Sequence, residues 1–205
     1  MVDLAVTLDQ QLYDMLLVDV QSFARDKGIK IAVNRGTCGI SASQLGKKEA
    51  DVGGFCCPPG PGDRLPGLRF HTLGISALSL LVHPDNPVGE LTRSQARKVF
   101  RGHIRNWDEV PGGERFNRNI APITRLHCKA RPGHWTLLLG KEELFSPNAE
   151  DAGDISIMVG QVSRYRDAIG YETLFWAKQI KKTVTPLQEA GYAPADLDAL
   201  AAGCY

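Results

Sequence analysis

The spacing of apolar residues in the first quarter of the chain alternates between two periods. Strands show apolar residues at every second position, and helices show them at every third or fourth. This pattern predicts strands at residues 2–7, 29–34 and 50–55, and helices at 12–23 and 39–49. The order β-α-β-α-β favours a parallel sheet flanked by helices.

The same alternation continues in the rest of the chain. A near-continuous apolar strand at 77–84 ends in proline, and Thr92 is placed to begin the helix that follows it. Further strands are expected at 120–125 and 168–173, and further helices at 133–140, 154–165 and 193–203. The fold class is therefore α/β, with two halves joined near residues 72–82.

Composition excludes several classes of protein. The chain has 205 residues, of which 43% are hydrophobic, and its net charge is +1. No overall positive field attracts nucleic acid, so we expect no nucleic-acid partner. No apolar run approaches the roughly 20 residues of a membrane-spanning helix, and the first residues show no export signal.

Three strand-to-helix junctions carry polar side chains, and the last two also carry glycines: VTLDQ (6–10), NRGTCGIS (34–41) and TRLHCKARPGHW (124–135). In open α/β folds, anions bind where a strand ends and the N–H groups of the next helix begin. The candidate residues at these junctions are Thr7, Asp9, Arg35, Gly36, Thr37, Gly39, Arg125, Gly133 and His134. Glycine and threonine also cap helices without any ligand, so each junction alone fits capping equally well.

Cysteine and histidine gather at two of these junctions and at the end of the strand expected at 50–55. The residues are Cys38, Cys56, Cys57, His127, Cys128 and His134. They are suitable ligands for zinc or copper, but their spacing matches no structural zinc motif, and adjacent cysteines are poorly suited to one tetrahedral ion. Disulfides, such as Cys38 with Cys56 or Cys57, and buried thiols remain open as alternatives.

Catalysis has weaker support than binding. Cys128 with His127 or His134 is the only nucleophile and base pair in view, and adjacent residues on an extended segment point in opposite directions. We therefore expect no catalytic residue and no cofactor, and we interpret Trp107 and Trp135 as packing residues.

A long segment resembles a known family. ALSLLVHPDNPVGELTRSQARKVFRGHIRNWDEVPGG, residues 77–113, is similar to the substrate-binding proteins of bacterial phosphate importers, as are IAPITR, AIGYETLFWA and VTPLQEAGYAP further on. The resemblance implies a two-lobed type II periplasmic-binding-protein fold with a hinge of two crossover strands. It places residues 1–78 and 178–205 in lobe 1 and residues 79–177 in lobe 2, with the ligand in the cleft between the lobes.

The resemblance also implies a function. We expect an extracytoplasmic solute-binding protein, its export signal trimmed from this chain, that acts as a monomer and delivers a small phosphate-like anion to an ABC-type membrane permease. By position, Thr7, Thr37, Arg125 and the Gly133-His134 pair match family contacts to the anion, and Asp9 is the carboxylate expected to accept a proton from it. His127 completes the expected site.

The sequence departs from the family at the cysteines. Cys38, Cys56, Cys57 and His134 stand where the family has hydroxyl groups, and soft sulfur ligands favour a thiol compound, an arsenic species or a transition metal. The alternative hypothesis is therefore a sensor domain of the same fold that binds a metal or thiol ligand and signals through a partner protein.

Overall fold

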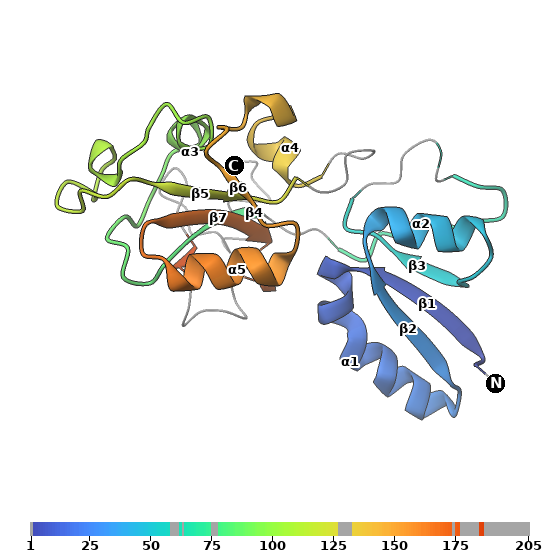
Figure 1. The fold of residues 1–205 in the computed structure, drawn as a ribbon. Helices are drawn as coiled ribbons and strands as arrows, with labels where there is room; N and C mark the ends of the chain where they lie inside the picture. The colour runs from blue at the N-terminus through green and yellow to red at the C-terminus, as the bar shows by residue number, and fades with distance from the viewer. Residues whose placement is uncertain are drawn as a thin grey trace. The chain divides into compact units, whose positions relative to one another are not determined.

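The computed structural model describes residues 2–57, 62, 64–74, 78–126, 133–173, 175–176 and 185–186. These residues form two compact units (Figure 1): unit 1 contains the described residues up to Leu73 together with Gly133, and unit 2 contains the others. The predicted lobe boundaries stay a prediction, because most of residues 178–205 lie outside the described set.

Unit 1 is a three-stranded parallel sheet with two helices. Its elements are β1 (Leu4–Asp9), α1 (Gln10–Lys27), β2 (Ile31–Gly36), α2 (Cys38–Gly46) and β3 (Val52–Gly54). The strand order is β2-β1-β3, and β1 pairs in parallel with both neighbours. Figure 1 shows α1 on one face of the sheet and α2 on the other. The β-α-β-α-β order and the parallel sheet expected from the sequence are confirmed.

The two helices of unit 1 begin directly at strand ends, each with a side-chain cap. Asp9 is the last residue of β1 and caps α1, because its carboxylate accepts a hydrogen bond from Leu12 N–H at 2.9 Å. Thr37 follows β2 and caps α2 by accepting from Ile40 N–H at 3.2 Å. Caps of this kind satisfy first-turn N–H groups that have no partner within the helix. They fix both helix starts at the carboxyl edge of the sheet.

The strand order creates a topological switch point in unit 1. The chain leaves the central strand β1 for β2 on one side and then returns past β1 to β3 on the other. Open α/β sheets bind ligands at such a switch point, outside the carboxyl ends of the strands. Asp9 is the last residue of β1, Thr37 and Cys38 follow β2, and Cys56 and Cys57 follow β3.

Unit 2 is built on a mixed sheet of order β6-β5-β7-β4-β8. Its strands are β4 (Leu78–Val82), β5 (Ala121–Thr124), β6 (Glu150–Asp151), β7 (Ala168–Thr173) and β8 (Thr185–Pro186). Its helices are α3 (Arg93–Phe100), η2 (Trp107–Glu109), α4 (Trp135–Leu138), η3 (Glu142–Leu144) and α5 (Ile155–Arg164). Strand β4 is antiparallel to β7, whereas β5 is parallel to it. The helix expected at 193–203 lies outside the described residues.

The core of unit 2 is aromatic. Phe100 makes edge-on contacts with Tyr171 and Phe145, with ring centroids 5.6 and 6.1 Å apart. Trp107 is fully buried and donates its indole N–H to Asp167 O at 3.0 Å, and Trp135 is 7% exposed. The interpretation of both tryptophans as packing residues is confirmed. Among the helices of the described ranges, none combines the length and the apolar composition needed to cross a bilayer.

Close packing against β3 gives a first prediction. A Cβ at Gly54 would lie 2.6 Å from Leu8 Cδ2 and 2.9 Å from Leu12 Cδ1, so Gly54→Ala should destabilise the protein by about 1–3 kcal/mol through overpacking. Gly160→Ala is the matched control, because nothing lies within 4 Å of that helical position and alanine should stabilise α5 by up to ~1 kcal/mol. Urea unfolding measures both changes, and equal midpoints for the two variants would contradict the prediction.

Candidate functional site

A buried carboxylate organises the carboxyl edge of the unit 1 sheet. Asp9 is 2% exposed. Its Oδ1 accepts from Leu12 N–H in the first turn of α1, and its Oδ2 accepts from the Cys38 thiol at 3.2 Å and from the backbone N–H of Cys56. One side chain therefore joins the first turns of α1 and α2 to the segment that follows β3.

Burial changes the acidity of this carboxylate. It raises the pKa of Asp9 from 3.8 to about 6, and the charge of the neighbouring Cys38 sulfur adds to the effect. Hydrogen bonds from the side chain of Cys56 and from the N–H group of Leu12 oppose it by stabilising the ionised form. Asp9 therefore changes charge in the mildly acidic range.

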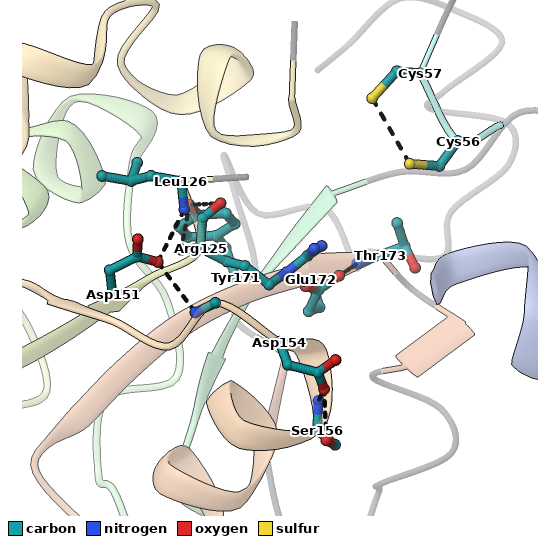
Figure 2. A network of polar contacts seen from close by, with 11 residues as sticks. Cys56, Cys57, Arg125, Leu126, Asp151, Asp154, Ser156, Tyr171, Glu172 and Thr173 are labelled. Carbon is teal, nitrogen blue, oxygen red and sulfur yellow. Dashed lines mark hydrogen bonds and ion pairs between the residues drawn. The ribbon is translucent and has the colours of Figure 1, made fainter. Parts of the chain in front are cut away.

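Three cysteine sulfurs meet beside Asp9. Cys38 Sγ and Cys56 Sγ are 3.5 Å apart, Cys56 Sγ and Cys57 Sγ are 3.7 Å apart, and all three lie within 4.8 Å of one another. A disulfide would need about 2.05 Å, so none joins these three residues to one another. Figure 2 shows the side chains of Cys56 and Cys57 turned toward each other. The contact with Cys38, together with burial, raises the pKa of the Cys56 thiol far above its usual range.

The other unit 1 residues predicted from the sequence surround this cluster unequally. Thr7 is fully buried, and its hydroxyl lies 3.2 Å from that of Ser41 on α2. Gly36 allows a tight strand-to-helix turn, because a Cβ there would lie 2.9 Å from Ile40 Cγ2. Arg35 is half-exposed and lies 3.7 Å from Asp14 of α1, an ion pair of small energetic value. Gly39 is exposed in the first turn of α2.

Ser41 was not predicted from the sequence. It is buried on the side of α2 that faces β1, three residues after Cys38, so the two side chains share one helix face. That spacing is the signal that could have identified it.

Arg125 in unit 2 lies in a buried ion pair. Its Nε donates to Glu172 Oε1 at 2.8 Å, and the two side chains are 1% and 0% exposed. Figure 2 shows Arg125 following β5 and Glu172 on the neighbouring strand β7. An anion that Arg125 binds would therefore share the guanidinium with Glu172. The signal for this partner was a glutamate in AIGYET, a strand whose six residues are all buried.

Hydrogen bonds to the backbone fix the chain around Arg125. Tyr171 OH accepts from Arg125 N–H at 3.0 Å, and burial raises the pKa of this hydroxyl above its usual range. Asp151 Oδ1 accepts from the N–H groups of Leu126 and Gly153, each at 3.2 Å (Figure 2). Neither Tyr171 nor Asp151 was predicted from the sequence. Tyr171 binds a residue distant in the sequence, and Asp151 binds N–H groups of irregular backbone.

The remaining predicted residues follow Arg125. His127 and Cys128 lie outside the described residues. Gly133 is buried, and His134 directly precedes the four-residue helix α4, so the predicted helix start is confirmed. Contact between these two residues and an anion stays a prediction.

Fold and site together define a class of protein. Two α/β units, one of which has a polar site at its topological switch point, are typical of ligand-binding α/β proteins. The chain belongs to the PBP superfamily domain family, whose model matches residues 4–201. The resemblance to phosphate-importer substrate-binding proteins and the type II periplasmic-binding-protein fold are confirmed.

Solved structures with low sequence identity share this fold. An ABC-type phosphate transport receptor from Vibrio cholerae has a TM-score of 0.74 and 22% identity, with 99% of this chain and 82% of that one covered. A protein assigned as a phosphate ABC transporter substrate-binding protein from Clostridium perfringens, with bound phosphate, has a TM-score of 0.85 and 17% identity. The match covers 98% of this chain and 81% of that one. The reduced form of the regulatory domain of OxyR2 from Vibrio vulnificus has a TM-score of 0.53 and 14% identity. The match covers 92% of this chain and 80% of that one.

The buried Asp9 predicts a pH dependence of stability. Between its usual pKa of 3.8 and the folded-state value of about 6, the folded protein binds more protons than the unfolded chain. The free energy of unfolding should therefore fall as the pH rises through this window, by up to about 3 kcal/mol from this group.

Asp9→Asn should remove that decrease, since asparagine also caps helices and does not ionise. Asp14→Asn, an exposed aspartate on α1, is the matched control and should keep the wild-type slope. Urea unfolding from pH 3.5 to 7.5 in a chelator tests the prediction. An unchanged slope in Asp9→Asn would contradict it.

The buried pair in unit 2 predicts strong coupling. Removing one charge leaves the other buried without its counter-ion, so Arg125→Met and Glu172→Leu should each destabilise the protein by about 3–5 kcal/mol. The double variant Arg125→Met/Glu172→Leu should lose much less than the sum of the two, because no uncompensated charge remains. Chemical unfolding of the wild type, the two single variants and the double variant gives the coupling free energy between the two residues. Additive losses would contradict the predicted coupling.

Proposed function

We propose that this protein is an extracytoplasmic solute-binding protein that captures a small, phosphate-like oxyanion for an ABC-type importer. The observation that carries the proposal is the start of α2, capped by Thr37, at the switch point beside Asp9. Family membership and the phosphate receptors among the similar structures support it. On this proposal the protein binds its ligand without chemical change and delivers it to a membrane permease.

The start of α2 has the electrostatics that an anion requires. First-turn N–H groups point out of the helix end, where the helix dipole is positive, and the nine residues of α2 provide more than two turns. Hydrogen bonds to an ionised oxygen are about twice as strong as neutral ones. On this proposal Thr37, Cys38 and Gly39 supply backbone donors to the anion, and donors from Arg125, Gly133 and His134 stay predictions.

Asp9 gives the site a means of discriminating between oxyanions. A carboxylate offers roughly four acceptor positions, and Asp9 accepts three hydrogen bonds from the described part of the chain. A position that remains can accept the proton of a singly protonated oxyanion such as hydrogen phosphate. Fully ionised sulfate has no proton to donate and meets only repulsion from the carboxylate, so the proposed site prefers the protonated oxyanion.

One observation favours the second candidate, a sensor domain for a metal or thiol ligand. Three cysteine sulfurs meet within 4.8 Å, beside the helix start proposed for the anion. Their chemistry suits a soft ligand better than an oxyanion. Similarity to the reduced form of an OxyR2 regulatory domain shows that this fold also occurs outside transport receptors.

A ligand panel tests the leading proposal. Phosphate, arsenate, molybdate and sulfate are compared by thermal shift and titration calorimetry at constant ionic strength, with chloride as the blank. Phosphate or arsenate at about 100 times its dissociation constant should stabilise the folded protein by ~2.7 kcal/mol, and sulfate much less. Asp9→Asn should reduce the preference for phosphate over sulfate, while Asp14→Asn should keep it. If no oxyanion raises the midpoint of unfolding, the proposal is wrong.

A further inference from the structure

We propose that Cys38, Cys56 and Cys57 form a three-sulfur site that binds one soft, thiophilic metal or metalloid ion. The proposal is separate from the oxyanion function, because it depends on the three sulfurs and not on the N–H groups of α2. It assigns the cysteines, which an oxyanion site does not require, a chemistry of their own.

The distances between the sulfurs fit a single central ion. Ligands about 2.3 Å from an ion and arranged at tetrahedral angles lie about 3.8 Å from one another. Cys56 Sγ lies 3.5 Å from Cys38 Sγ and 3.7 Å from Cys57 Sγ, and the third pair lies within 4.8 Å. Small rotations of the side chains therefore suffice to bring all three sulfurs to bonding distance.

The adjacent cysteines are able to act together in this structure. Alternation along a strand would send the side chains of Cys56 and Cys57 in opposite directions. Both residues lie in a bend after β3 has ended at Gly54, and their sulfurs approach each other (Figure 2). The bend therefore lessens the difficulty that the sequence raised against joint coordination by these two residues.

Regular structure holds the sulfurs in place. Cys38 is the first residue of α2, next to the Thr37 cap, and the backbone of Cys56 is tied to Asp9 at the end of β1. Cys38 and Cys57 are 1% and 3% exposed, so most of the site is shielded from water. Preorganised and shielded ligands lose little entropy when they bind an ion.

The ligand set selects the class of ion. Thiolates prefer Zn²⁺, Cu⁺ and other thiophilic ions, whereas Mg²⁺ and Ca²⁺ prefer oxygen ligands. Asp9 Oδ2, 3.2 Å from Cys38 Sγ, is an available fourth donor that would suit tetrahedral zinc, and the sulfurs alone suit a three-coordinate ion. Binding of Zn²⁺ or Cu⁺ forms three bonds from sulfur to the ion and releases the thiol protons to solvent. Binding of arsenite forms three arsenic–sulfur bonds and breaks three arsenic–oxygen bonds, and each hydroxyl group leaves with a thiol proton as water. No electron is transferred in either case.

Ion titration of the full chain tests the site. The protein is reduced with a phosphine, its five cysteines are confirmed as thiols by titration in denaturant, and Zn²⁺, Cu⁺ and arsenite are then added separately. At least one of the three should bind at one ion per chain, measured by native mass spectrometry and competition with a chelator or dithiol. Cys38→Ser, Cys56→Ser and Cys57→Ser should each weaken binding by more than roughly 100-fold, since even the loss of an outer-shell partner costs ~10–100-fold.

Cys204→Ser is the matched control for the loss of one thiol and should bind as wild type does, because the proposed site uses only Cys38, Cys56 and Cys57. Circular dichroism and thermal unfolding of each ion-free variant distinguish lost ligation from lost folding. X-ray absorption on the wild-type complex needs no variant and should show three sulfur neighbours at about 2.3 Å.

Two results would overturn the site: no binding by any of the three ions to the fully reduced protein, or fewer than three sulfur neighbours around the bound ion. A third result, unchanged affinity of Cys56→Ser for the ion, would also overturn the site. The oxyanion panel is read on the same preparation, so a protein that binds phosphate but no ion refutes only this inference. A protein that binds an ion but no oxyanion refutes only the transport proposal.

Discussion

The hydrogen bonds to the buried carboxylate of Asp9 are the interaction on which unit 1 depends. A carboxylate removed from water is costly unless donors replace its hydration. The donors come from the first turn of α1, the first residue of α2 and the backbone after β3. Because these groups belong to three separate connections, satisfying one side chain also fixes the edge of the sheet at which the candidate site is built.

Unit 2 stabilises its buried carboxylate in a different way. Glu172 on β7 is paired with Arg125 after β5, and the neighbouring Tyr171 binds the backbone of the same arginine. Glu172 has an arginine as its partner, whereas Asp9 is buried with no cation among its described hydrogen-bond donors, and burial raises its pKa to about 6. The two units therefore contribute different properties: a buried ion pair in unit 2, and a carboxyl in unit 1 whose charge responds to its surroundings.

Much of the fold could be predicted because it is encoded locally. The β-α-β-α-β order, the cap at Thr92 and strand β7 follow from periodicity and turn residues. The two-residue strand β6 and the short helices η2 and η3 were missed, since such short elements have no measurable period.

The site was predicted in part for the same reason. Asp9, Thr37 and Cys38 were identified because they stand at junctions between a strand and a helix. The partnership of Arg125 with Glu172 was not, because it joins residues 47 positions apart. The closeness of Cys56 and Cys57 depends on a bend after β3, and a turn-rich sequence does not specify the side-chain directions within such a bend.

The switch point in the strand order also affects how this family can diversify. The loops that follow β1, β2 and β3 come from separate stretches of the chain, while the sheet itself is held by backbone pairing and buried aliphatic side chains. One or two substitutions in a single loop can therefore replace hydroxyl donors with sulfur ligands without disturbing the strands. A shared fold at 22% sequence identity with a phosphate receptor is compatible with a very different ligand chemistry.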